Sequence, residues 1–153
     1  MPETSDNTMI EALSEALETM AFMVPMPPEE ELPIPDESVL VRMRFTGPLS
    51  GTAELVAGKE LLQMLAANVL GIEPDEEEAQ EKGTDAFKEL LNTTCGVLLP
   101  MLATTPKDVF DITVPESEGL GSVEEWQAYV ARSDVTILDV DGCAMAVKIE
   151  FEN

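Results

Sequence analysis

The sequence predicts one α+β domain over residues 1–153, in which a largely antiparallel sheet packs against long helices. The length of 153 residues is that of one domain. Apolar residues make up 44% of the chain, which is enough to build a core. A helical pattern followed by a pair of strand patterns occurs in both halves. We therefore expect two pseudo-duplicated α-β-β halves.

A helix and an extended loop are predicted first. Apolar residues recur with helical spacing over residues 7–23, and Asn7 suits the N-cap. Residues 25–38 contain five prolines. Proline stops a helix, and too few residues precede this stretch to fold alone, so it is predicted to be a loop of the same domain.

A hairpin and a second helix follow. Residues 39–45 and 52–57 alternate with period two, and a turn rich in glycine and proline separates them. Gly58 then opens a helical pattern over Lys59–Leu70, and Gly71 is a suitable C-cap. This region is predicted as strand, turn, strand and helix.

The third helical region has a clear helical pattern in its centre, whereas its start can be interpreted in two ways. Asp75 and Glu78 have the spacing of a capping box. Gly83 leaves two alternatives open, one long helix or a short helix followed by a long one. The main segment is predicted over residues 84–99, and Pro100 is expected to bend or end it.

The C-terminal third predicts short strands around one short helix. The Asp141-Gly142 pair is a type I′ hairpin signal. In order, we expect a strand over 109–114, a loop over 116–122, a helix over 124–131, a strand over 135–140 and its return over 143–151.

Charge excludes several classes of function. Asp and Glu number 31, Lys and Arg 8, and histidine is absent, so the net charge is −23. This charge disfavours nucleic acid and anionic membranes as partners. Without histidine, Ser-His and Cys-His catalysis and imidazole-bound zinc are excluded. Cys95 and Cys143 are expected to be free thiols. No signal-peptide pattern or membrane span is evident, so we expect a cytoplasmic protein.

One face of the main helix carries residues that are candidates for a functional site. Asp85, Glu89, Asn92 and Gly96 are spaced i, i+4, i+7 and i+11, which places them on one helical face. A carboxylate and a carboxamide are therefore exposed one turn apart, and the glycine leaves room for a close partner surface. By spacing alone, such a stripe is more often an ordinary solvated helix face.

A longer pattern makes the stripe more specific. Asp85, Glu89 and Asn92 are followed by 22 residues and then Pro115. This arrangement resembles the Asp/Ser-x3-Glu-x2-Asn-x22-Pro signature of the CheC/CheX/FliY family of chemotaxis phosphatases. The resemblance covers about residues 9–151, and it implies a CheC-like fold.

The first helix resembles a degenerate copy of the same motif. Ser14 and Glu18 have the motif spacing, but Ala21 stands where the motif has asparagine. Arg44 occupies the position of the proline. A single intact motif in the second half is similar to CheX, whereas CheC-like members have two active copies.

The resemblance implies a phosphatase that hydrolyses the aspartyl phosphate of a CheY-like response regulator and so terminates a chemotaxis or two-component signal. Asn92 and Glu89 are then the catalytic residues, the first positioning water and the second pairing with a lysine of the regulator. Asp85, Lys88 and Gly96 are assigned to partner docking. The chain needs no metal or cofactor of its own, because the regulator supplies Mg²⁺. A homodimer is also implied, formed by sharing sheet edges in the C-terminal strands.

Two other classes of function compete with this interpretation. One is a non-catalytic adaptor of the same fold that binds signalling or flagellar-switch proteins. The other is a small acidic chaperone for a secreted partner, which size and charge permit. The intact Glu89 and Asn92 pair favours the phosphatase, and a chaperone leaves the 22-residue gap before Pro115 unexplained.

Overall fold

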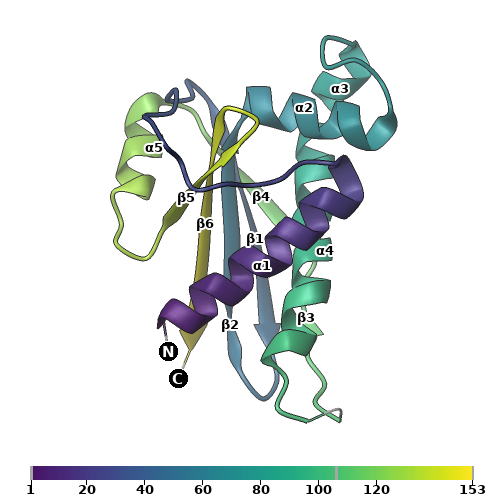
Figure 1. The fold of residues 1–153 in the computed structure, drawn as a ribbon, viewed down its shortest axis with the longest axis vertical. Helices are drawn as coiled ribbons and strands as arrows, with labels where there is room; N and C mark the ends of the chain where they lie inside the picture. The colour runs from purple at the N-terminus through teal and green to yellow at the C-terminus, as the bar shows by residue number, and fades with distance from the viewer. Residues whose placement is uncertain (1, 106, 153) are drawn as a thin grey trace.

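The computed structural model describes residues 2–105 and 107–152 and shows one antiparallel sheet with helices on both faces (Figure 1). In chain order the elements are α1 (Pro2–Ala21), β1 (Ser38–Thr46), β2 (Ser50–Gly58), α2 (Lys59–Leu70), α3 (Glu77–Glu81), α4 (Gly83–Leu102), β3 (Asp111–Ile112), β4 (Glu116–Leu120), α5 (Val123–Val130), β5 (Thr136–Val140) and β6 (Cys143–Glu152). The predicted α+β class is confirmed.

The sheet has the strand order β3-β1-β2-β6-β5, and β4 also pairs with β1. Every pairing between these strands is antiparallel. β3 and β4 lie end to end along the same edge of β1, since β3 pairs with residues 45–46 and β4 with residues 38–42. Residues 113–115 lie between these two strands and do not continue the regular pairing with β1.

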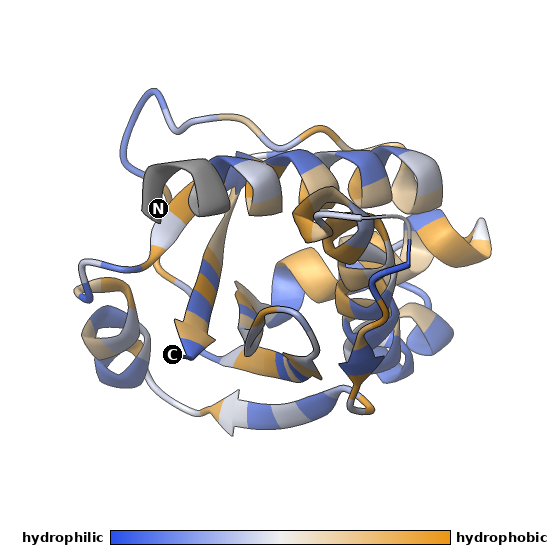
Figure 2. Cartoon of the chain, turned by 90° about the horizontal axis from the view of Figure 1, so that it is seen from below, coloured by the Kyte–Doolittle hydropathy of each residue, from blue (hydrophilic) through white to orange (hydrophobic). Residues whose placement is uncertain are grey.

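The inner face of the sheet forms the main core. α1, α2 and α4 cover this face (Figure 1), and hydrophobic and hydrophilic residues alternate along the strands (Figure 2). Alternation places every second strand residue inward, so Val41, Leu55 and Val147 pack with Phe87 and Leu90 of α4. α4 is thereby held against the sheet by its apolar side, and its polar side faces away.

The outer face carries a smaller apolar cluster under α5. Trp126 is 4% exposed and packs with Leu40, Val56 and Ala146. The Ser122 hydroxyl caps α5 by accepting a hydrogen bond from the Glu125 N–H. Trp126 thus anchors α5 to the outer face of the sheet.

A charged cluster beside α5 surrounds the buried carboxylate of Glu54, which is 5% exposed. The Tyr129 hydroxyl donates to it at 2.7 Å, and Arg42 Nε donates at 2.6 Å. Lys148 Nζ lies 3.9 Å away. Burial favours the neutral acid, but these hydrogen bonds and charges outweigh it and lower the pKa of Glu54. The cluster ties α5 to β1, β2 and β6.

Several local predictions are confirmed. The hairpin of residues 38–58 pairs in register, and α2 begins and ends at the predicted residues. Gly71 has φ +72° and caps α2 in the left-handed conformation. Asp141 and Gly142 have φ +51° and +85°, as a type I′ turn requires. Of the two alternatives at Gly83, the structure has a short helix followed by a long one.

Two predicted helix starts are wrong. α1 begins at Pro2, so Asn7 lies inside the helix and is not its N-cap. Proline is well suited to a first helical turn because that turn needs no donor from it. α3 begins at Glu77 and has no side-chain cap, so the predicted capping box at Asp75 does not form. The carboxylate of Glu76 instead accepts a bond from the Glu73 N–H in the preceding turn.

Three predictions after the main helix also need correction. α4 continues to Leu102, beyond the predicted end at residue 99, and Pro100 lies within its last turn, where it removes one backbone hydrogen bond. The strand predicted over 109–114 is reduced to Asp111–Ile112. Residues 116–120, predicted as loop, form β4. Its first four residues are exposed, so no apolar alternation marked it, and pairing with β1 decides its conformation.

Among the described residues, no helix combines the length and apolar character that a membrane crossing requires.

Candidate functional site

The exposed face of α4 carries the predicted stripe. Asp85, Glu89 and Gly96 are exposed and Asn92 is half-buried, whereas Leu90 on the opposite side is fully buried. The helical period separates the two sets, because residues three and four apart share a face. A carboxylate and a carboxamide therefore lie one turn apart on a helix fixed by its core side.

Pro115 lies in the same groove as the motif side chains, although 22 residues separate it from Asn92. α4 continues past the motif, and the chain then returns alongside it through β3 (Figure 1). The resulting groove has a volume of about 390 Å³. Its lining residues are Asp85, Lys88, Glu89 and Asn92 from α4, and Ile112, Thr113, Val114 and Pro115 from the returning chain.

The break between β3 and β4 shapes this side of the groove. The Thr113 N–H donates to the Arg44 carbonyl at 2.9 Å, and the Thr113 hydroxyl accepts from the Arg44 N–H at 2.9 Å. The Thr113 hydroxyl oxygen thus accepts the hydrogen bond from Arg44 that a backbone carbonyl would accept in a regular strand pair. Pro115 has no N–H to donate, so the ladder stops there and resumes at Glu116 opposite Arg42. Val114 and Pro115 therefore line the groove instead of continuing the edge strand.

Charged groups in the groove are available to a partner. Within the part of the chain that the structure describes, Asp85, Lys88 and Glu89 form no ion pair. The Thr93 hydroxyl donates to Glu89 Oε1 at 3.4 Å and orients this carboxylate. Sequence reasoning did not assign this contact, although the i, i+4 spacing of the pair was a signal for it.

The degenerate first copy has no comparable site. α1 ends at Ala21, which is fully buried, so the position of the motif asparagine is inside the core. The next residue, Phe22, has φ +57° and leaves the helix. α4, in contrast, continues for ten residues beyond Asn92. The structure therefore agrees with one intact motif in the chain.

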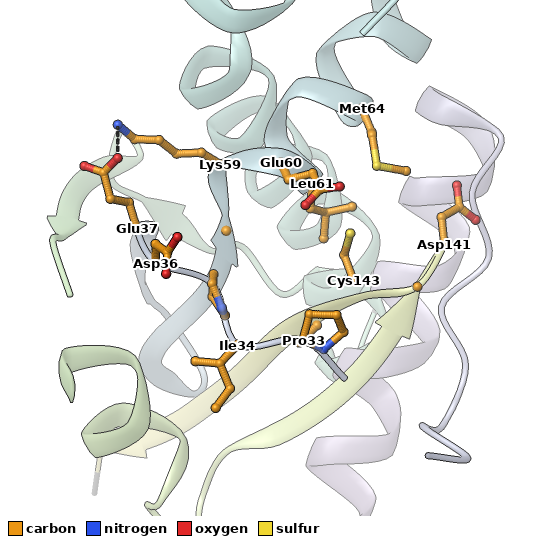
Figure 3. A pocket seen from close by; sticks show the side chains of 14 residues that line it. Pro33, Ile34, Asp36, Glu37, Lys59, Glu60, Leu61, Met64, Asp141 and Cys143 are labelled. Atoms are coloured by element: carbon orange, nitrogen blue, oxygen red, sulfur yellow. Dashed lines mark ion pairs between the residues drawn. The ribbon is translucent and has the colours of Figure 1, made fainter. Parts of the chain in front are cut away.

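A second hollow, of about 530 Å³, shares no residue with the motif groove (Figure 3). It lies between the proline-rich loop, the start of α2 and the β5–β6 turn. Lys59 pairs with Glu37 at 3.3 Å on its wall. Burial and the nearby carboxylates of Glu60 and Asp141 raise the pKa of the Cys143 thiol, so this cysteine is a poor nucleophile at neutral pH.

Neither the other predicted thiol nor the acidic side chains of the described residues form an assembled site. Cys95 is fully buried, and burial raises its pKa to about 12. In residues 2–105 and 107–152, no three or more acidic or cysteine side chains are grouped so that they could hold a metal ion.

Comparison with known proteins shows what this chain is similar to. A family model described as "Chemotaxis phosphatase CheX" matches residues 39–117, just over half of the chain. The match includes the whole motif from Asp85 to Pro115. No curated protein matches the sequence significantly.

Solved structures share the fold over nearly the whole chain. A chemotaxis protein CheX from Desulfovibrio desulfuricans is 16% identical with a TM-score of 0.70, covering 97% of this chain and 99% of its own. A CheX-CheY-BeF3-Mg²⁺ complex from Borrelia burgdorferi gives 22% identity and a TM-score of 0.64, with 96% and 97% covered. FliY from Thermotoga maritima is 16% identical with a TM-score of 0.62, covering 99% and 91%.

Proposed function

Because the chain belongs to the CheX family of chemotaxis phosphatases, we propose that it accelerates hydrolysis of the aspartyl phosphate on a CheY-like response regulator and so ends the signal. One observation carries the proposal. The carboxamide of Asn92 and the carboxylate of Glu89 lie together on a rigid helix face, in one groove with Pro115.

The reaction needs a positioned water more than a strong base. An acyl phosphate is hydrolysed when a water oxygen attacks phosphorus in line with the bond to the aspartyl oxygen, which then leaves as carboxylate. A carboxamide can accept from the water and donate to a phosphoryl oxygen. Asn92 is proposed to hold the water in this way, and orientation supplies the rate gain.

The charged neighbours of Asn92 are proposed to dock the partner. Glu89, oriented by Thr93, pairs with a lysine beside the regulator's phosphorylated aspartate. Asp85 and Lys88 contact the same partner from the groove walls, and Gly96 permits its close approach. The Borrelia burgdorferi structure, which contains CheX with CheY, BeF3 and Mg²⁺, supports this class of partner. Mg²⁺ is proposed to belong to the regulator, with no cofactor held by this chain.

The proposal is tested by following the decay of a phosphorylated CheY-like regulator from the same cell. Wild type is expected to accelerate the decay, and Asn92→Ala and Glu89→Ala to lose most of that acceleration, each by about 10²-fold or more. If no regulator of the cell decays faster, the phosphatase assignment is wrong. Binding without faster decay identifies the adaptor instead. If the Asn92→Ala protein is as active as wild type, the chain is a phosphatase but Asn92 is not the residue that positions the water.

A cytoplasmic homodimer remains a proposal. β6 lies between β2 and β5, so of the two C-terminal strands only β5 is at a sheet edge. Met26 bridges part of that edge through two hydrogen bonds with Asp139, at 2.9 and 2.7 Å. An edge-shared dimer would therefore use the residues before Asp139. Sedimentation of wild type and an Ile137→Pro variant tests this, because proline blocks pairing at that edge.

A further inference from the structure

Exposed apolar side chains continue the motif groove along the returning chain. Val109 is 75% exposed, Ile112 45% and Val114 81%. Their backbone is held in place: β3 pairs with β1, and the Phe110 ring packs edge-on against Phe45 at 6.3 Å. These three residues form a fixed apolar ridge beside α4.

A hollow of about 740 Å³ lies on the same side of α4, next to the motif groove. Its lining is mostly apolar and includes Gly96, Leu99, Pro100, Val109 and Phe110, with Thr104, Thr105 and Asp108 as its polar residues. A Cβ at Gly96 would meet no atom of a neighbouring element within 4 Å, so packing against the rest of the chain does not require glycine there. The ridge and this hollow together are called the apolar strip.

An interface of ordinary size that includes Asn92 is large enough to reach the apolar strip. A stable complex buries about 800 Å² on each side, a disc of roughly 16 Å radius. Along α4, Gly96 lies about 6 Å from Asn92 and Pro100 about 12 Å, at the rise of an α-helix. Ile112 and Val114 line the same groove as Asn92. An interface of this size centred on Asn92 would reach these residues.

Charge explains why this partner needs apolar contact. A chain at −23 meets an acidic phosphorylation pocket with long-range repulsion. Lys88 is the one basic side chain among those that line the motif groove. The favourable binding free energy must then come from burial of apolar surface, a contribution that does not depend on the net charges of the two proteins.

We propose that the apolar strip is the affinity-determining half of the docking surface for the response regulator, and that the hollow beside Gly96 takes an apolar side chain of the same receiver domain. This inference rests on the proposed function, because the partner is identified by the phosphoryl site at Asn92. It adds a role for residues outside the motif: the motif supplies the chemistry and the strip supplies the affinity.

The test measures binding instead of turnover. The probe is a CheY-like receiver domain from the same cell in its BeF3⁻/Mg²⁺ form, titrated against the full chain. Ile112→Ser and Val114→Ser are each expected to weaken binding several-fold, and together by at least about tenfold. The matched control is Ile34→Ser, since Ile34 is also 45% exposed but lines the separate hollow of Figure 3. Affinity should not fall between 50 and 500 mM salt, because salt screens the repulsion between the two proteins and leaves the buried apolar contact in place.

Further variants separate the two proposals. Gly96→Leu, whose Cβ has open space around it and whose side chain would occupy part of the hollow, should also weaken binding. Asn92→Ala should keep binding the BeF3⁻ form while losing phosphatase activity. Wild-type affinity in the Ile112→Ser/Val114→Ser protein overturns the docking inference and leaves the proposed function intact. Binding of no receiver domain, or conversion of a dimer to a monomer by the double variant, overturns it as well.

Discussion

Replacing Gly96 by alanine is expected to stabilise the protein and weaken its complex with the regulator. Gly96 lies inside α4, four residues before Pro100, and is exposed. Its φ is not in the left-handed region, which in the described chain is occupied by Gly71 and Gly142 among the glycines. The backbone at this position therefore accepts any L-residue without strain.

The size of the gain follows from the empty space around Gly96. An added Cβ meets no atom within 4 Å, so it neither clashes nor packs. What remains is helix propensity and the lower entropy of the unfolded chain, about 0.5–1 kcal/mol. The entropy of unfolding of 153 residues is about 0.3 kcal/mol/K near 60 °C, so Tm should rise by about 2–3 °C.

The assay is reversible urea unfolding and thermal melting followed by circular dichroism, with receiver binding measured on the same samples. Gly83→Ala is the matched control in the same helix. Its Cβ would lie 3.1 Å from the Leu62 Cβ and 3.4 Å from the Leu62 backbone, so it should gain nothing or lose stability. A Gly96→Ala protein less stable than wild type would mean that the added Cβ does meet other atoms or that the helix is strained at this position. Unchanged receiver affinity would show that the partner does not approach Gly96 closely.

Four other outcomes are expected. Glu54→Gln should lower the free energy of unfolding at pH 7 by about 1–3 kcal/mol in urea titrations. The pKa of Glu54 is depressed in the folded state, so its stabilisation is present above the unfolded value of 4.5 and is lost as pH falls. The variant should therefore lose less stability than wild type between pH 6 and 3; an equal loss contradicts this account. Tyr129→Phe removes the hydroxyl that donates to Glu54 and should lower the free energy of unfolding by about 1–2 kcal/mol. The loss is larger if no other group donates to the carboxylate in its place. Phe22→Gly should stabilise by about 0.5–1 kcal/mol, because Phe22 is 84% exposed at φ +57°; a loss would mean that the ring packs in solution. A thiol reagent should label Cys143 before the fully buried Cys95, increasingly at alkaline pH.

Local chemistry made much of the fold predictable. The hairpin of residues 38–58, the boundaries of α2 and the turn at Asp141 follow from alternation, glycine position and turn propensity, which act between near neighbours. The stripe of Asp85, Glu89 and Asn92 follows from helical period alone. Errors fell at the helix starts predicted at Asp75 and Asn7, because a side-chain cap contributes only about 1 kcal/mol and does not by itself fix where a helix begins.

The class of the fold, the face of α4 that carries the motif and, by resemblance, the family could be read from the residues alone. Tertiary contacts were needed to show that Pro115 shares a groove with Asn92, that pairing with β1 breaks at residues 113–115, and that Ile112 and Val114 stand exposed beside the motif. The physical reason is that strand pairing at a sheet edge is a contact between distant residues. β4 shows no apolar alternation, so its place was set by the free edge of β1 and not by its own residues.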